Sequence, residues 1–391
     1  MKLVVVGFGQ CGSRIADEFA RLNKRARRHR RIEITPGVFA VNTDVGDLSG
    51  LSYIKSDFQH RILIGGRETG GHGVGKINER GAEIAKADSD KIIDALRSTK
   101  RFYDSDAFLL VASTAGGTGS GSIPVMTQVI KERYNDKHVY ALLALPFEHE
   151  ERTEVRTVYN TATCLKSVSS VADAVILIDN HRYIKKDFSL KNNMAKINEL
   201  IVEPFYDLLC AGEEKKAKHI GTRLVDAGDI METLTGWTII GYGKSQLPLI
   251  RLPFGRKLNF RKKSTETHNG IQAMDSAFSE LSLECNPKNS GRALYLLSAP
   301  AKEMNMDLVK ELGDYLSNVA SEAVIRYGDY PREESSLTVT IILSQFKHVE
   351  KVKRYYNEFP ESMQEQERRE KDIEAQLEEM ADASISIPSL L

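Results

Sequence analysis

Residues 113–122 read S-T-A-G-G-T-G-S-G-S, directly after the apolar run 107–112 and before a helical pattern whose first turn is expected to hold Pro124. An apolar strand, a glycine-rich loop and a helix, in that order, bind phosphates in α/β proteins. Gly116 and Gly121 have P-loop spacing, but the Lys that a P-loop requires is absent. The small residues therefore predict a nest of backbone N–H groups for a di- or triphosphate, with glycines that adopt φ > 0 or let phosphate approach closely.

Short apolar, β-branched runs separated by helical patterns fill the first half of the chain. They lie at residues 2–7, 37–42, 61–65, 107–112, 139–145 and 174–179. Continuous apolar strands that alternate with helices are typical of a parallel sheet covered on both faces. The sequence thus predicts the fold class α/β, with a doubly wound parallel-sheet domain over residues 1–188.

The second half of the chain has a different pattern. Apolar residues at helical spacing predict a long helix over 191–210, so residues 189–236 are expected to be a connecting helix and a loop. A smaller α+β domain is predicted over 237–346. Its elements are strands at 238–243, 293–299 and 337–343 and a helix at 306–327.

Two charged segments stand outside these elements. Residues 347–391 are expected to form a charged helix over 361–380 and a short tail. Residues 21–31, R-L-N-K-R-A-R-R-H-R-R, hold seven Lys or Arg. This basic run is either a solvated helix end or a docking patch for an acidic partner, such as the acidic C-terminal helix of a neighbouring copy.

The composition limits the class of protein. The 391 residues include 54 Lys and Arg and 54 Asp and Glu, so no global field attracts nucleic acid. The four cysteines have no C-x-x-C spacing, which indicates neither a disulfide framework nor a zinc site. No run approaches the roughly 18 apolar residues of a membrane span. We expect a cytoplasmic protein without nucleic-acid partners, direct membrane insertion or a metal site of its own.

Three further loops follow predicted strands and should meet at the same edge of the sheet. G-F-G-Q-C-G (7–12) matches G-x-G-x-x-G before a helix expected to begin near Ser13, which leaves an NAD(P)-dependent oxidoreductase as an alternative. That enzyme needs an acidic residue about 20 positions later, whereas Asp44 in N-T-D (42–44) comes farther along the chain. The third loop, 65–75, holds six glycines.

Together these loops resemble the tubulin/FtsZ superfamily, and the mixture of features is most similar to the archaeal CetZ proteins. A-G-G-T-G-S-G (115–121) matches the superfamily signature, G-Q-C-G (9–12) is the tubulin form of the first loop, and N-T-D is the FtsZ form of the second. The resemblance implies a GTP-binding domain joined by a long central helix to a smaller α+β domain. It implies GTP or GDP as ligand, with Mg²⁺ bound mainly through the phosphates. The implied phosphate-side residues are Gly9, Gln10, Cys11, Gly12, Asp44, Gly70, Gly71, Ala115, Gly116, Gly117, Thr118, Gly119 and Ser120.

The resemblance extends to the base and the ribose. L-I-D-N (177–180) is similar to the segment that ends in the guanine-reading asparagine, which implies this role for Asn180. In the central helix, Asn198 falls at the second base-reading position and Met194 where the family stacks a side chain on the purine. The segment 146–156 leaves open whether Glu150 or Arg156 meets the ribose.

The loop T-R-L-V-D-A-G-D-I (222–230) is similar to the family's catalytic loop, which acts on the nucleotide of the next subunit. Asp226 and Asp229 match it, whereas Leu224 stands where the family usually has Asn. The resemblance implies head-to-tail filaments and a GTPase activated by self-assembly, in cell-shape control or division. Other tubulin/FtsZ-like polymers and membrane-linking proteins are further expected partners. The Leu224 departure leaves a non-hydrolysing GTP-binding modulator of another polymer as a second alternative.

Overall fold

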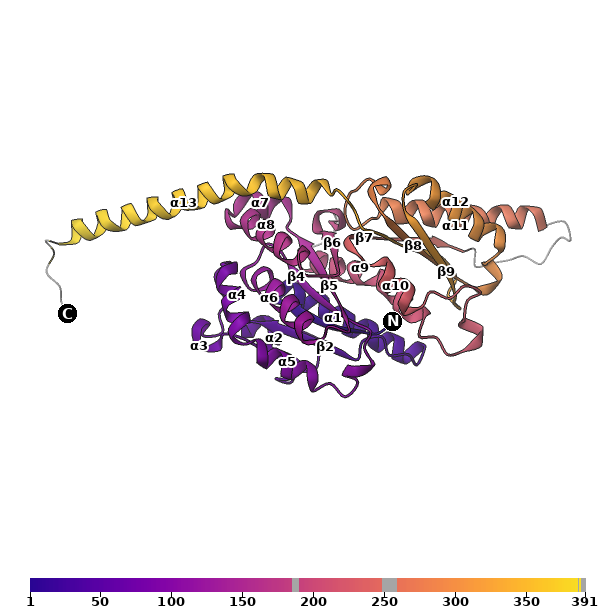
Figure 1. Ribbon diagram of the computed structural model, residues 1–391, viewed down its shortest axis with the longest axis horizontal. Helices are drawn as coiled ribbons and strands as arrows, with labels where there is room; N and C mark the ends of the chain where they lie inside the picture. The colour runs from indigo at the N-terminus through magenta and orange to yellow at the C-terminus, as the bar shows by residue number, and fades with distance from the viewer. Residues whose placement is uncertain (185–189, 248–258, 386, 388–391) are drawn as a thin grey trace.

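The computed structural model describes residues 1–184, 190–247, 259–385 and 387, and Figure 1 shows the course of the chain. Its described strands are β1 (Leu3–Phe8), β2 (Gly37–Asn42), β3 (Arg61–Leu63), β4 (Ala107–Ser113), β5 (His138–Leu145), β6 (Ala174–Asp179), β7 (Gly236–Gln246), β8 (Arg292–Ala299), β9 (Val324–Pro331) and β10 (Ser336–Ser344). They form one sheet in the order β3-β2-β1-β4-β5-β6-β7-β10-β8-β9.

The first half of this sheet is parallel, as the apolar runs predicted. Neighbouring strands from β3 to β6 pair in parallel, and β7 continues the pattern by pairing with the start of β6. Strand β10 then lies antiparallel to β7 and β8. The two halves of the chain thus share one continuous sheet.

Helices cover both faces of the sheet. They are α1 (Gly9–His29), α2 (Val45–Ser49), α3 (Gly66–Thr69), α4 (Asn78–Ala87), α5 (Ser89–Arg97), α6 (Gly117–Arg133), α7 (Glu148–Thr153), α8 (Arg156–Ser169), α9 (Leu190–Ala211), α10 (Ala227–Thr233), α11 (Asn259–Ser279), α12 (Met306–Val319) and α13 (Glu350–Ser384). Because side chains alternate along a strand, Val4 and Val6 join the apolar cluster under α4, α6 and α8, whereas Leu3 and Val5 join the cluster under α1 and α9.

The helix predicted over 306–327 is wrong from residue 320 onward. Helix α12 ends at Val319, and the chain returns as strand β9, which pairs in parallel with β8 from Val324 to Pro331. The β-branched Val324 and Ile325 favour a strand, and the apolar spacing alone concealed the break. The charged C-terminal helix also begins earlier than predicted, at Glu350, so that its first turns pack on α8 (Figure 1).

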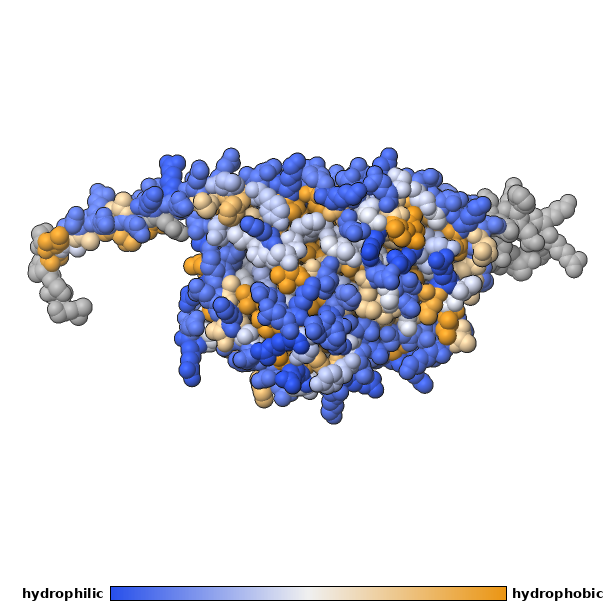
Figure 2. Space-filling view, in the orientation of Figure 1, coloured by the Kyte–Doolittle hydropathy of each residue, from blue (hydrophilic) through white to orange (hydrophobic). Residues whose placement is uncertain are grey.

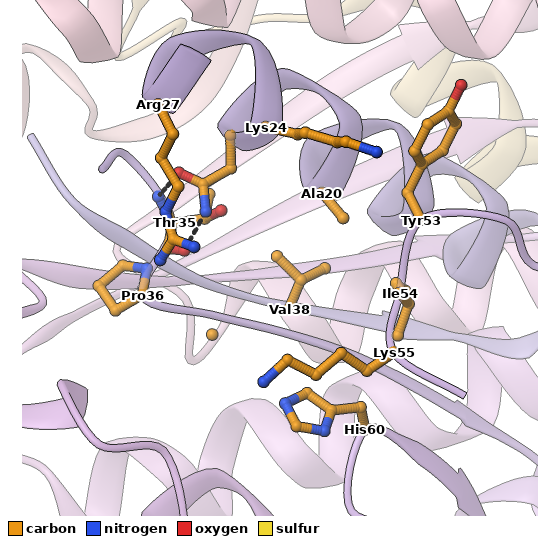
Figure 3. A pocket seen from close by; sticks show the side chains of 12 residues that line it. Ala20, Lys24, Arg27, Thr35, Pro36, Val38, Tyr53, Ile54, Lys55 and His60 are labelled. Atoms are coloured by element: carbon orange, nitrogen blue, oxygen red, sulfur yellow. Dashed lines mark hydrogen bonds between the residues drawn. The ribbon is translucent and has the colours of Figure 1, made fainter. Parts of the chain in front are cut away.

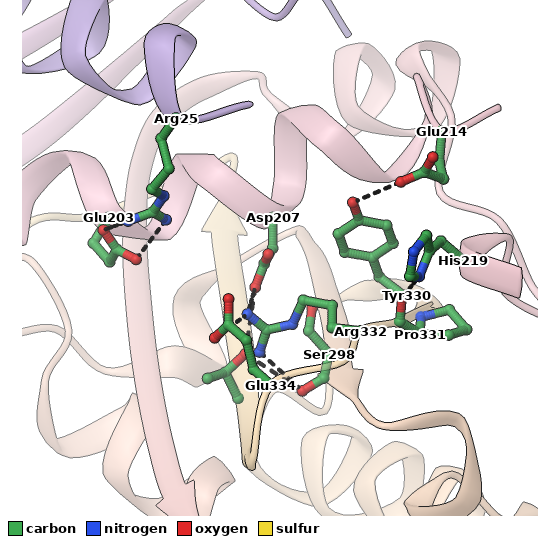
Figure 4. Close-up of polar contacts among 11 residues, drawn as sticks. Arg25, Glu203, Asp207, Glu214, His219, Ser298, Tyr330, Pro331, Arg332 and Glu334 are labelled. Carbon is green, nitrogen blue, oxygen red and sulfur yellow. Dashed lines mark hydrogen bonds and ion pairs between the residues drawn. The ribbon is translucent and has the colours of Figure 1, made fainter. Parts of the chain in front are cut away.

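The central helix α9 is held by ion pairs on two sides (Figure 4). Arg25 of α1 donates to both carboxylate oxygens of Glu203 at 2.9 and 2.8 Å. On the other side, Arg332 Nη1 lies 2.9 Å from Asp207 Oδ2, and the two side chains are only 3% and 4% exposed. Arg332 also donates to the Thr338 hydroxyl, so the ion pair links α9 to the start of β10.

None of the helices in the described part of the chain is long and apolar enough to cross a membrane.

Candidate functional site

The glycine-rich loops after β1 and β4 are shorter than the sequence suggested, because the helices begin inside them. Helix α1 begins at Gly9 rather than near Ser13, and α6 begins at Gly117. Pro124 therefore lies in the interior of α6 and not in its first turn, which corrects the prediction. The amino ends of both helices lie at the carboxyl edge of adjacent parallel strands.

Both helix ends are open to an anion. Neither α1 nor α6 has a side-chain cap or an acidic residue in its first turn. The first N–H groups of a helix lack partners within the helix and carry a partial positive charge, which favours a phosphate. Gly116, directly before α6, has open space where a side chain would lie.

Several glycines of the signature serve packing rather than backbone conformation. A Cβ on Gly121 would lie 2.0 Å from Asn78 O, and one on Gly117 would lie 2.8 Å from Ile77 N, so both let α6 approach the α4 segment. Gly12 likewise faces Val111 O at 2.2 Å, which brings α1 onto β4. The glycines of 116–121 do not adopt φ > 0, which corrects that part of the expectation, whereas Gly9 of the first loop has φ of 69°.

In the loop 65–75 the glycines do adopt the left-handed region. Gly70 and Gly71 have φ of 60° and 80°, which other residues adopt at a cost. This loop joins the N-T-D segment, because Val45 N donates to Gly71 O and Gly73 N to Thr43 O. Asp44 caps α2 by accepting from Asp47 N at 3.0 Å, and its backbone pairs with that of His72, which is exposed.

Two residues outside the predicted set join these loops to one another. The hydroxyls of Thr43 and Thr118 lie 2.6 Å apart and are buried, which ties the second loop to the signature. Asn160 Nδ2 donates to Lys76 O at 2.9 Å and to Ala115 O at 3.0 Å, which ties the residue directly after the loop 65–75 to the signature. Thr43 stands inside the quoted N-T-D, so its neighbours were the available signal, and Asn160 lies in α8.

Other predicted phosphate-side residues fall at the same edge. Thr118 and Ser120 are buried, and Ser120 Oγ bonds back to Gly116 O within the first turn of α6. Gln10 is exposed, and a Cβ on Gly9 would lie 2.9 Å from Gly119 N. The first loop and the signature are therefore in direct contact.

At the base-side end, two asparagines occupy buried positions. Asn180 follows β6 and Asn198 lies in α9, and their side chains are 5% and 6% exposed. No hydrogen bond among the described residues engages either amide group. Met194, one turn before Asn198 on α9, is half-buried against the cluster under α1 and α9. These groups offer donors, acceptors and an apolar surface to a planar ligand.

The structure separates the two candidates for the ribose. The Glu150 carboxylate accepts from Phe147 N at 2.9 Å and lies near Cys11 of the first loop, where burial and this carboxylate raise the pKa of the thiol to about 12. Arg156 instead forms an ion pair with Glu79 of α4. Glu150 is thus beside the first loop, and Arg156 is held toward α4.

The predicted catalytic acids lie elsewhere. Asp226 caps α10 by accepting from Asp229 N at 2.9 Å, and Asp229 is 39% exposed with Arg326 Nε 3.4 Å away. Helix α10 ends at Thr233, just before β7, whose start pairs with the start of β6. It therefore lies at the amino edge of the strands, about 20 Å from the carboxyl edge for a strand of six residues.

Figure 1 shows the same separation, with α10 and the loop around α3 on different sides of the molecule. Leu224, before α10, is 41% exposed. Sequence reasoning missed Arg326, because β9 was read as a helix. Within the described residues, no group of three or more His, Cys, Asp or Glu side chains could hold a metal ion.

Comparisons with known proteins agree with this architecture. Residues 2–186 match the model of the Tubulin/FtsZ family, GTPase domain, and residues 187–360 match that of the Tubulin-like CetZ, C-terminal domain. The tubulin-like protein CetZ1 of Haloferax volcanii is 32% identical over 88% of this chain and 87% of its own. The CetZ of Pyrococcus abyssi is 29% identical over 95% of each chain.

Two solved structures are similar over almost the whole chain. The GDP-bound monomer of CetZ1 from H. volcanii has a TM-score of 0.78 at 28% identity, covering 93% of this chain and all of its own. The GTPγS-bound protofilament of CetZ2 from the same organism has a TM-score of 0.77 at 26% identity, covering 94% of this chain and all of its own. This chain therefore belongs to the tubulin/FtsZ superfamily, a family of GTP-binding cytoskeletal proteins, as one of its CetZ-type members.

Proposed function

We propose that this chain binds GTP and GDP at the carboxyl edge of β1, β2 and β4. The observation that carries this proposal is the pair of uncapped helix ends, α1 and α6, beside a residue position, Gly116, with open space. These helix ends and the loops at 9–12, 70–71 and 115–120 hold the phosphates. Asp44 helps to place Mg²⁺, which is bound mainly through the nucleotide.

In this proposal the base lies between β6 and α9. Asn180 and Asn198 read the guanine edge, since their buried amides have no partner within the described protein, and Met194 stacks on the purine. Glu150 receives the ribose hydroxyls, because it lies near Cys11, whereas Arg156 is engaged with Glu79. Gly70, Gly71 and His72 sense the γ-phosphate.

The catalytic acids then act on the nucleotide of another copy. Asp226 and Asp229 lie at the opposite edge of the sheet from the phosphate loops, so head-to-tail stacking brings the α10 of one molecule onto the loops of the next. Such a contact is heterologous and generates a filament when it does not close. The GTPγS-bound protofilament of the related CetZ2 supports this arrangement.

In GTP hydrolysis the protein has to position the attacking water and the γ-phosphate and to stabilise the charge of the transition state. Asp229 orients a water against the γ-phosphate, and the Arg326 guanidinium, 3.4 Å away, positions the Asp229 carboxylate. Asp226 keeps α10 in place through its cap. Hydrolysis therefore requires assembly, and the protein is a GTPase that its own polymerisation activates.

We further propose a cytoplasmic role in cell-shape control or division, with the filament itself as the principal partner. In this proposal, residues 1–188 bind the nucleotide, residues 189–236 carry the catalytic loop, and residues 237–346 complete the head-to-tail contact surface of the filament. The match of the GTPase-domain model over residues 2–186 disfavours the oxidoreductase alternative, which needs the same segment for NAD(P).

GTP turnover measured across protein concentration tests this proposal. Wild-type turnover should rise faster than linearly with protein, and Asp229→Asn should lower turnover per polymer about 100-fold or more, because the water loses its orienting carboxylate. GTP affinity and polymer mass should stay unchanged. Glu311→Gln, at an exposed carboxylate of α12 that has no ion pair among the described residues, is the control and should keep turnover within about twofold. No turnover in the wild type would favour the non-hydrolysing modulator, and unchanged turnover in Asp229→Asn would remove the shared site.

A further inference from the structure

A cavity of about 290 Å³ lies beside the C-terminal half of α1 (Figure 3), whereas the phosphate loop 9–12 lies at the amino end of that helix. Lys24 and Arg27 of α1 line it on one side, and Lys55 and His60 on the other. It adjoins a second cavity of about 400 Å³, which shares Arg27, Lys55 and His60 and adds Lys100 and Arg101. We refer to the two cavities together as the α1 groove.

The α1 groove is positively charged. No Asp or Glu lines the first cavity, and Glu33 is the one carboxylate of the second. Glu33 is already engaged by Arg27 and Arg101. Lys24 and Lys55 are exposed, form no ion pair among the described residues, and approach the opening from opposite sides in Figure 3.

Beneath these cations the groove is apolar. Ala20, Pro36, Val38 and Ile54 line the first cavity. Thr35, also in the lining, is 1% exposed, and its hydroxyl has no hydrogen-bond partner in the part of the chain that the structure describes. A cationic rim over an apolar floor suits an acidic ligand that also carries an apolar face.

The chain itself contains such a segment at the end of α13. Residues 372–384 include five Asp or Glu and no Lys or Arg. Ile373, Leu377 and Met380 are spaced along one side of this segment and are 56%, 64% and 71% exposed. The carboxylates occupy the other sides of the helix, so the segment is an acidic amphipathic helix about 20 Å long.

The last turns of α13 extend clear of the molecule (Figure 1), and Figure 2 shows apolar side chains along one side of this projecting part. Every residue of 372–384 is exposed. An exposed apolar stripe is unfavourable in water unless another surface covers it. Because α13 leads away from the body, the described part of the same molecule does not cover this stripe.

We propose that residues 372–384 of one copy dock in the α1 groove of another copy. The apolar stripe of Ile373, Leu377 and Met380 lies on the floor, and the carboxylates meet Lys24, Lys55, Lys100 and the arginines. Two such segments repel each other through their carboxylates, so the groove is the better partner than a second α13. The contact joins a site beside α1 to a distant helix and can link neighbouring filaments laterally.

Carbodiimide cross-linking of the full-length protein tests the contact without GTP, so a failure of assembly-dependent hydrolysis would not affect the outcome. The reagent joins Lys to a carboxylate at zero length. In a mixture of ¹⁵N-labelled and unlabelled protein at low salt, we expect mixed-isotope links from Lys24 or Lys55 to acidic residues of 372–384. Salt at about 0.5 M should remove them, because it screens exposed charges. Links only within one molecule, or between two α13 helices, would overturn the proposal.

A second experiment reverses the charges on the two sides of the proposed contact. Self-association of each variant is measured by sedimentation velocity in the presence of GDP. Lys24→Glu with Lys55→Glu should weaken self-association about tenfold or more, and so should Glu378→Lys with Glu379→Lys. All four changes in one chain should restore association to within about threefold of wild type, because each contact then has opposite charges again. Lys302→Glu with Lys310→Glu, far along the chain, is the matched control and should have no effect. Self-association that is unchanged in all of these charge variants would also overturn the proposal.

Discussion

At the scale of the residue, the glycines of 116–121 divide into two kinds. Gly121 faces a neighbouring backbone, since its Cβ would lie 2.0 Å from Asn78 O. Gly116 has an extended backbone, with φ of −79° and ψ of 168°, and open space around it. Gly121 serves the packing of α6 on α4, and Gly116 faces the proposed phosphate site.

Two alanine substitutions separate these roles. Gly121→Ala should lower the free energy of unfolding by about 1–3 kcal/mol, because the added methyl group pushes α4 away. Gly116→Ala should leave unfolding unchanged and weaken GTP binding about tenfold. Urea unfolding of the nucleotide-free protein and calorimetric titration with GTP measure the two effects. Equal losses of stability in both variants would contradict the division.

The signature itself could be read from the sequence, but the packing role of its glycines could not. The sequence gives no indication that α4 approaches α6, because this contact joins segments about 40 residues apart. Glycine also disfavours a helix, so the start of α6 at Gly117 runs against local propensity. Tertiary contact, rather than propensity, decides this helix start.

At the scale of the element, the central helix α9 connects the two halves of the molecule. It carries Asn198 for the proposed base site and Asp207 for the ion pair with Arg332. Burial raises the pKa of the Asp207 carboxyl, and the Arg332 guanidinium opposes that shift. The pair is thus costly to bury and still more costly to break.

Breaking the pair tests its structural role. Asp207→Ala should lower the free energy of unfolding by about 3–5 kcal/mol, because the buried Arg332 guanidinium then keeps only the exposed carboxylate of Glu334 as an acidic partner among the described residues. Replacing both partners, with Asp207→Leu and Arg332→Met, should recover most of that loss. Glu322→Ala at the exposed pair with Lys347 is the control and should leave the unfolding midpoint unchanged. A single variant as stable as the double variant would show that the pair does not hold α9.

The elements themselves were largely predictable, since continuous apolar runs fall on the buried strands of the parallel half. Strand β9 was the exception. Its exposed start at Val324 follows closely on α12, and helical spacing of apolar residues continued across the break. An edge strand with one partner has a weak sequence pattern, because only part of it is buried.

At the scale of the whole molecule, the proposed nucleotide site and the proposed catalytic acids occupy opposite edges of one sheet. The sequence supplied both sets of residues, but strand order and direction determine which edge each set occupies. The start of β6 beside the start of β7 brings α10 to the amino edge, and the ends of β1 and β4 bring the helix ends to the carboxyl edge. A complete site then needs two copies.

Mixing two inactive variants tests this central claim most directly. Gly117→Val should lose GTP binding, because its side chain collides with the backbone at Lys76 and Ile77, while its Asp229 stays intact. Asp229→Asn should bind GTP without hydrolysing it. Each variant alone should show turnover near background, and an equal mixture should recover a substantial fraction of wild-type turnover, because the pocket of one meets the Asp229 of the other. A mixture as inactive as its separate components, although the two variants co-assemble, would contradict the account.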